Sequence, residues 1–97
     1  MVGAVIHDLQ SIGNGAYLQA KPAPAIEWVI HNIYHPNSIE LKIVDGSGNE
    51  CSFYEEADKG FITNCYMHLT DSHYLRIYNV SGGDMYLAYD GIITLEP

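Results

Sequence analysis

Hydrophobic and polar residues alternate with a period of two along most of this chain. The alternation is clearest where Ile39, Leu41 and Ile43 are separated by Glu40 and Lys42. Successive side chains of a β-strand point to opposite faces, so this pattern predicts a strand with one buried face. Similar runs, separated by Gly, Pro, Asn and Asp, predict further short strands at 1–9, 16–20, 26–35, 50–55, 65–70, 75–77 and 85–89.

Seven or eight short strands with frequent turn residues predict an all-β fold. We expect an antiparallel β-sandwich, jelly-roll-like in its connections, because no segment carries an apolar stripe at helical spacing. Pro22 and Pro24 follow the second strand and place it at a sheet edge, since proline lacks a backbone donor. A bulge near His31 and Asn32 reconciles the two halves of the third strand.

The segment 62–94 predicts a three-stranded meander, with reversals at 71–72 and at the glycine-containing run 79–84. The predicted core follows from the parity of each strand. It consists of Trp28, Ile30, Leu41, Ile43, Met67, Leu69, Leu75, Ile77 and Leu87.

Two parts of the chain are distinguished by composition. Residues 1–14 form an N-terminal strand or arm that ends in a glycine-rich break, and residues 15–97 form a single sandwich domain. The arm is apolar and β-prone, so we expect it to add a strand to a neighbouring chain. Its contacts would come from Val2, Val5 and Ile6.

Charge and cysteine content exclude several classes of function. The 97-residue chain has a formal charge of −8, with four Lys and Arg against twelve Asp and Glu. Such a charge repels phosphate backbones and anionic lipids, so we expect neither nucleic-acid nor membrane binding. No signal-peptide pattern is visible, which favours synthesis in the cytoplasm. Cys51 and Cys65 do not make a disulfide framework of the kind that small secreted domains use. The parity of Cys65 favours a buried thiol over a bridge to Cys51, which stays the alternative.

The histidines and acidic residues do not predict a reaction centre. His31 and His35 would stand roughly 13 Å apart on a strand, too far to share a zinc ion. His68 and His73 flank a turn, where solvated side chains are favoured over a metal site. The run Asp71-Ser72-His73 contains the residue types of a hydrolase triad, but neighbours on a turn cannot align for proton transfer. We therefore expect no enzyme activity, no catalytic residue, no cofactor and no metal.

Tyrosine is the most informative residue type, with eight copies against two Phe and one Trp. Four of these tyrosines cluster near the C-terminus and are candidates for partner binding: Tyr74, Tyr78, Tyr86 and Tyr89. Exposed rings can fill a partner's pockets or stack on sugars. The alternative is that they pack along the sandwich with only their hydroxyl groups in water.

Several motifs resemble those of small structural proteins of tailed bacteriophages, and in particular capsid decoration (cement) proteins. The resemblance covers about residues 15–94 and rests on Tyr17-Leu18 before the proline segment, EWVIHNIY at 27–34, LTDSHYLRIYN at 69–79 and YDGI at 89–92. It implies a β-sandwich on the outer surface of the virion, commonly a homotrimer, that bridges subunits of the major capsid protein. Two other classes stay open: a tail-associated or surface carbohydrate-binding module, and a small cupin-like metal enzyme.

Overall fold

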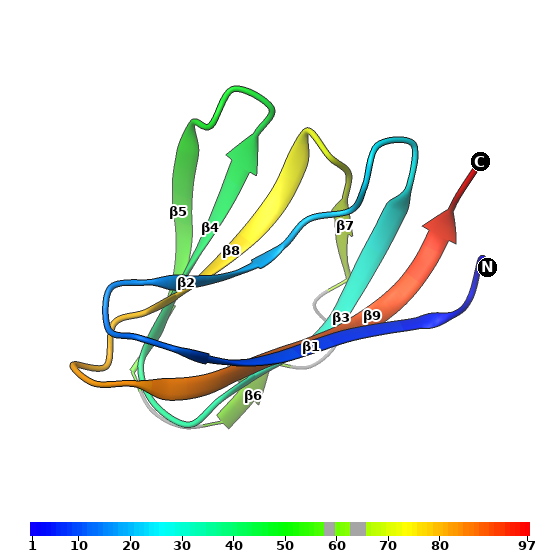
Figure 1. Cartoon of the computed structure of the whole chain (residues 1–97). Helices are drawn as coiled ribbons and strands as arrows, with labels where there is room; N and C mark the ends of the chain where they lie inside the picture. The colour runs from blue at the N-terminus through cyan, green and yellow to red at the C-terminus, as the bar shows by residue number, and fades with distance from the viewer. Residues whose placement is uncertain (58–59, 63–65) are drawn as a thin grey trace.

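The computed structural model describes residues 1–57, 60–62 and 66–97, and in this part of the chain it consists of strands and loops without a helix. Two antiparallel sheets pack face to face (Figure 1). The strands are β1 (Val5–Ile12), β2 (Tyr17–Ala20), β3 (Glu27–His35), β4 (Ile39–Asp45), β5 (Glu50–Glu56), β6 (Gly60–Ile62), β7 (Met67–Leu69), β8 (His73–Asn79) and β9 (Met85–Leu95).

The strand order is that of a jelly roll. Sheet A has the order β1-β9-β3-β6, with β7 also paired to β3, and sheet B has the order β2-β8-β4-β5. Because β6 and β7 pair with successive parts of β3, they occupy one strand position between them. Eight strand positions in two sheets, filled by a chain that repeatedly crosses between them, define this architecture. The predicted jelly-roll-like β-sandwich is confirmed.

The predicted C-terminal meander is wrong, although its strands exist. Of its three strands, β7 and β9 lie in sheet A and β8 lies in sheet B. The tight turn at 71–72 is present, but it holds only an isolated bridge between Thr70 and His73 before the strands separate. Crossing to the opposite sheet lets Leu69 and Ile77 bury their side chains in one core between the sheets, where both are almost fully inaccessible.

The core agrees with the sequence prediction. Six of the nine predicted residues are buried, namely Ile30, Leu41, Leu69, Leu75, Ile77 and Leu87. Trp28, Ile43 and Met67 are half-buried and pack against that cluster. The expected bulge in β3 is also present, since the β3–β9 register shifts between Ile30 and Asn32. The burial of Cys65 and its pairing with Cys51 lie outside the described residues, while the Cys51 side chain is exposed.

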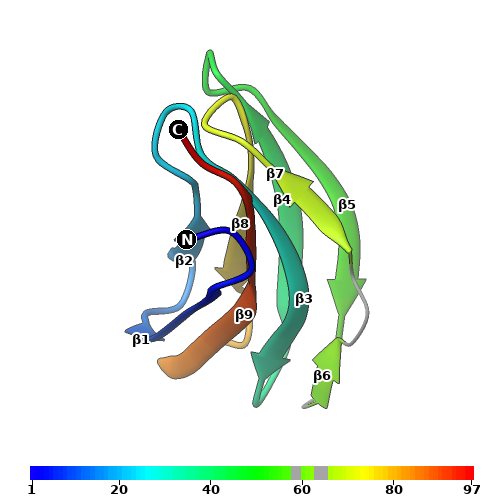
Figure 2. The same cartoon turned by 90° about the vertical axis from the view of Figure 1, so that its right-hand side faces the viewer.

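The N-terminal segment is part of the sandwich. β1 pairs with β9 from Val5↔Ile92 to Ile12↔Met85 without a register shift, and it ends sheet A. Figure 2 shows β1 at one end of this sheet and β6 and β7 at the other. β2 ends sheet B, as the two prolines that follow it predicted. No segment of the described chain is a helix of the length and apolarity needed to cross a membrane.

Candidate interaction surface

A cluster of tyrosines and cations covers the outward face of sheet B. Its members alternate with core residues along three strands. Leu18 on β2, Leu41 on β4 and Leu75 on β8 point inward, so their neighbours along each strand point outward. We call this cluster the tyrosine–cation face. It comprises Tyr17, Lys21, Lys42, Tyr74, Arg76 and Tyr78.

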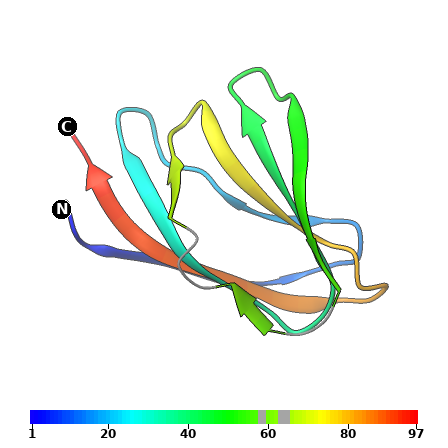
Figure 3. The same ribbon diagram turned by 180° about the vertical axis from the view of Figure 1, so that it is seen from behind.

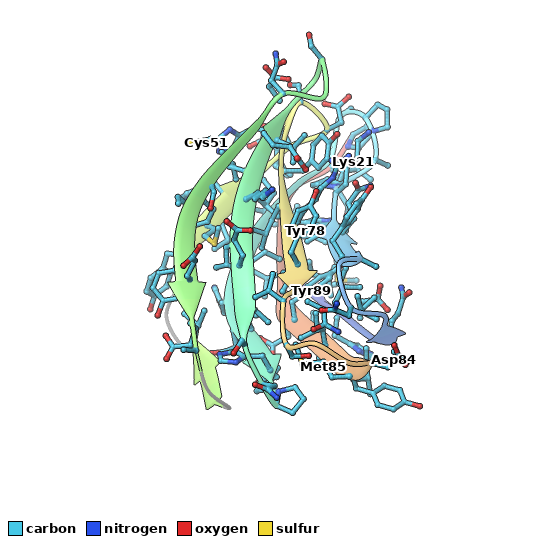
Figure 4. The ribbon with its side chains drawn as sticks, turned by 90° about the vertical axis from the view of Figure 1, so that its left-hand side faces the viewer. Lys21, Cys51, Tyr78, Asp84, Met85 and Tyr89 are labelled. Atoms are coloured by element: carbon cyan, nitrogen blue, oxygen red, sulfur yellow. The ribbon has the colours of Figure 1, made fainter. Side chains whose placement is uncertain are left out.

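Three neighbouring strands bring the face together by their register. Tyr17 on β2 lies opposite Tyr78 on β8, with ring centres 5.0 Å apart. Lys42 on β4 lies opposite Arg76 on the other side of β8. Figure 4 shows Lys21 and Tyr78 on this side of the molecule. Residues far apart in the sequence therefore form one continuous surface.

Each cation of the face lies over a tyrosine ring. The Arg76 guanidinium carbon is 4.5 Å from the centre of the Tyr17 ring and 5.9 Å from that of Tyr74. The amino groups of Lys21 and Lys42 lie 4.7 Å and 4.4 Å from the ring centres of Tyr74 and Tyr78. Such distances are within the range of cation–π attraction. The long cationic side chains leave Tyr74 only 6% exposed, although it points outward.

Glu50 on β5 offsets the repulsion between the two facing cations. Like charges directly opposite each other on neighbouring strands are destabilising. The Glu50 carboxylate accepts a 2.7 Å hydrogen bond from Arg76 Nη1, lies 3.9 Å from Lys42 Nζ, and accepts a hydrogen bond from the Tyr78 hydroxyl. The Tyr78 and Arg76 hydrogen bonds hold the pKa of Glu50 below its ordinary value. The carboxylate is thus ionised at neutral pH and fixes three side chains of the face.

The contacts with Glu50 also shift the pKa values of Tyr78 and Arg76. Burial, followed by the hydrogen bond to Glu50, raises the pKa of Tyr78. The hydrogen bond to Glu50 is the main cause of the raised pKa of Arg76. Both shifts keep Tyr78 neutral and Arg76 charged at neutral pH, so the Arg76–Glu50 ion pair and the Tyr78 hydrogen bond persist there.

The tyrosine–cation face differs in charge from the chain as a whole. It contains three of the four Lys and Arg residues in a chain with twelve Asp and Glu. On the same side of sheet B, the register also places Glu40, Glu50 and Glu55. Together with these three glutamates, the tyrosine–cation face is close to neutral, whereas the remainder of the chain carries nearly all of the negative charge.

The structure separates the seven residues that the sequence predicted for partner binding. Tyr74 and Tyr78 lie on sheet B, whereas Tyr86 and Tyr89 lie on sheet A, so the four tyrosines do not form one cluster. Tyr89 points into the core and is 5% exposed, while Tyr86 points outward and is 64% exposed. In the N-terminal segment, Val2 and Val5 are exposed, and Ile6 is half-buried against the core.

The predicted site omitted Tyr17, Lys21, Lys42 and Arg76. Their outward parity was visible in the alternation of each strand, but alternation does not identify which strands are neighbours. β2 and β8 are separated by more than half of the chain, so no local pattern signals that Tyr17 lies beside Tyr78.

The histidines are distributed over several environments. His35 is buried and its Nδ1 lies 3.0 Å from the Asn37 carbonyl oxygen, while the His31 ring contacts the Tyr66 ring. His68 and His73 border the same shallow hollow of about 280 Å³, beside Phe53. Within residues 1–57, 60–62 and 66–97, no three His, Cys, Asp or Glu side chains gather in a geometry that would hold a metal ion.

Comparisons with known proteins do not assign this chain to a family. No protein-family model matches it, and no curated protein matches it. Its candidate function therefore rests on the geometry of its surfaces and on the sequence resemblance described above.

A surface of tyrosines and arginine is suited to binding a protein. Tyr and Arg are enriched at the buried centres of protein–protein interfaces. Their positions are fixed before binding by the cation–π contacts and by Glu50, so less conformational entropy is lost on association. The ring faces of Tyr74 and Tyr78 are covered by cations, which hinders stacking on a sugar.

Proposed function

We propose that this chain is a non-enzymatic assembly protein that binds another protein through the tyrosine–cation face. The observation that carries the proposal is the gathering of three of the four cationic residues over three tyrosines on one sheet of an acidic chain. The partner we propose is the major capsid protein of a tailed bacteriophage, on the virion surface. The jelly-roll sandwich is compatible with that role, and the resemblance to decoration proteins supports it.

The charge distribution supports a specific orientation on such a partner. The nearly neutral tyrosine–cation face would meet the partner, and the acidic remainder of the chain would stay in solvent. Burying this face costs less electrostatic energy than burying an acidic one, because Arg76 and Lys42 are already paired with Glu50. An acidic outer surface also keeps the assembled particles apart in solution.

The test is co-sedimentation of the chain with expanded capsids that lack a decoration protein, assembled from the major capsid protein of the same genome. We expect saturable binding, and we expect Arg76→Ala to weaken it at least about tenfold, since Arg76 contacts two tyrosines and Glu50. Thr94→Ala, on β9 of sheet A, is the matched control and should leave binding unchanged.

Folding of each variant is checked by thermal melting, and Lys21→Ala provides a second, milder change on the same face. Wild-type protein that fails to bind the capsids would contradict the capsid partner. Binding that survives both Arg76→Ala and Lys21→Ala would show that a different surface makes the contact.

One observation favours carbohydrate binding as a second candidate function. The exposed ring of Tyr86 borders an open hollow of about 780 Å³ at one end of the sandwich, together with Asn37, Ser81 and Asp84. Figure 4 shows Asp84 and Met85 at this end. An exposed aromatic ring beside amide, hydroxyl and carboxylate groups is suited to a sugar. A glycan array would test this function, and Tyr86→Ala should abolish any signal.

A further inference from the structure

The edges of the two sheets are not equally protected against pairing with another strand. β2 has only four residues and is followed by Lys21, Pro22 and Pro24. β5 contains a bulge opposite β4 and carries acidic residues at both ends. β6 and β7 have three residues each. Short length, proline, charge and bulges are the features by which proteins block edge pairing.

β1 has the fewest of these protective features, since Asp8 is its single charged residue. It runs for eight residues, Val5–Ile12, in unbroken register with β9, and it contains no Pro, Lys or Arg. Among the described residues, no strand pairs with its other side. The outward side chains of Val5 and Leu9 are 72% and 61% exposed. Figure 3 shows the opposite side of the sandwich, where β6 and β7 lie, and β1 crosses behind β9.

We propose that β1 pairs antiparallel with β1 of a second copy of this chain, so that the two copies of sheet A form one continuous sheet about a twofold axis. This inference goes beyond the proposed function, because the pairing needs no capsid. It also predicts two copies, where the resemblance to decoration proteins implied three.

The twofold axis limits the register of the two strands. Residues directly opposite each other in an antiparallel pair have their side chains on the same face. The outward side chains of the two copies therefore share one face only if one residue of β1 lies opposite the same residue of the second copy. Centring on Asp8 would oppose two carboxylates, which is destabilising. Centring on His7 or Gln10 would place the Asp8 carboxylate opposite an isoleucine.

Centring on Leu9 avoids these conflicts and gives matched pairs across the axis. Leu9 lies opposite Leu9 on the outer face, and Asp8 lies opposite Gln10 on the inner face. The two side chains suit each other, since Gln10 Nε2 donates a 2.7 Å hydrogen bond to Asp8 Oδ2 within one chain. Further along the strand, Ile6 lies opposite Ile12 and His7 opposite Ser11. The sequence of β1 is thus self-complementary in this register.

Charge also distinguishes this edge from the rest of the chain. Asp8 is the one carboxylate of β1, whereas the chain as a whole carries a formal charge of −8. Two copies repel each other over longer distances, and added salt screens that repulsion with a Debye length of about 10 Å at 0.1 M. The self-association should therefore strengthen as the salt concentration rises.

The first experiment measures the mass of the purified chain by light scattering and sedimentation equilibrium, at 0.05 M and 0.5 M NaCl. We expect twice the chain mass of 10.8 kDa, with tighter association at high salt. Leu9→Lys places the ammonium groups of the two copies opposite each other at the twofold axis, so it should weaken the dimer at least about tenfold. Tyr86→Lys is the matched control, because Tyr86 is similarly exposed on the same sheet face but lies on β9, and it should leave the dimer intact.

The second experiment tests the register in a Cys51→Ser background, which removes the exposed native thiol. Leu9→Cys should give a covalent dimer with a short bis-maleimide, whereas Val5→Cys and the parent should not.

A single-copy or three-copy mass at every concentration would overturn the proposal, as would a dimer unaffected by Leu9→Lys. A dimer in which Leu9→Cys does not cross-link would overturn the Leu9 register. Capsid binding is measured separately, so its failure does not affect this result.

Discussion

The buried amide of Asn79 donates a 2.7 Å hydrogen bond to the backbone oxygen of Ile12, and so joins the end of β8 to the end of β1. The same nitrogen donates to the Gly83 oxygen, also at 2.7 Å, and Asn79 Oδ1 accepts hydrogen bonds from the backbone nitrogen and the hydroxyl of Ser81. This side chain is fully buried and fully paired. It fixes the crossing from sheet B to sheet A.

Asn79→Ala should therefore lower the free energy of unfolding by about 2–4 kcal/mol, because it removes the donor to the Ile12 oxygen in a buried site together with the hydrogen bonds to Gly83 and Ser81. Urea denaturation measures the change. Asn49→Ala is the control, since Asn49 makes its hydrogen bonds to Asp45 in an exposed turn, and its cost should be much smaller. Equal losses in the two variants would show that the Asn79 network adds no stability beyond that of an ordinary turn.

Leu41 and Ile77 face each other across β4 and β8 in the core. Either truncation to alanine should cost about 2–5 kcal/mol, because each removes buried methyl groups and leaves a cavity. The double variant should lose a different amount from the sum of the two, since the two cavities adjoin. Single losses below about 1 kcal/mol would contradict the assignment of these residues to the core.

Stability should fall at alkaline pH through Tyr89. Burial and the nearby Asp8 carboxylate raise the pKa of Tyr89 to about 12, against an unfolded value of about 10. The folded state therefore holds the Tyr89 proton more tightly than the unfolded state does. The contribution of Tyr89 to the free energy of unfolding is complete below about pH 10 and is lost between about pH 10 and 12. Urea midpoints across this range should fall less for Tyr89→Phe than for the wild type. If the urea midpoints of the two proteins fell in parallel with pH, Tyr89 would have the same pKa in the folded and unfolded states.

Gly91 lies where β9 passes closest to β3. A Cβ atom at this position would be 2.9 Å from the Ile30 Cα and would collide with the Val29 carbonyl oxygen. Gly91→Ala should destabilise the fold by about 1–3 kcal/mol or more, because the backbone of β3 would have to shift. Gly83→Ala is the matched control, as a Cβ atom added to Gly83 would have no neighbour within 4 Å. A neutral Gly91→Ala would indicate that the bulge relaxes freely.

Much of the fold was predictable because period-two alternation is a local property. It located the strands, the inward side of each strand and the bulge near His31, and the prolines after β2 marked an edge. Strand partners are not local properties. The sequence neighbours β7, β8 and β9 look like a meander, but they alternate between sheets because both sheets must contribute to one core.

The candidate site was less predictable than the fold for the same reason. Tyr89 shares its parity with Leu87, so its burial was visible in the strand pattern. Tyr74 has outward parity but is buried, with Lys21 and Arg76 lying over its ring. Those covering contacts depend on the pairing of β2 with β8, which no motif in either strand encodes.

The two ends of the chain meet beside the same strand pair. The Gly3 nitrogen donates a 2.7 Å hydrogen bond to the Ile93 oxygen, the N-terminal amino group contacts Glu96, and Figure 1 shows both ends on one side of the sandwich. A short glycine linker can therefore join residue 97 to residue 1 while new ends open in the exposed Asp45–Asn49 turn. Such a circular permutant would carry a fused cargo on the β4–β5 turn of sheet B, away from β1, with every strand still in its place.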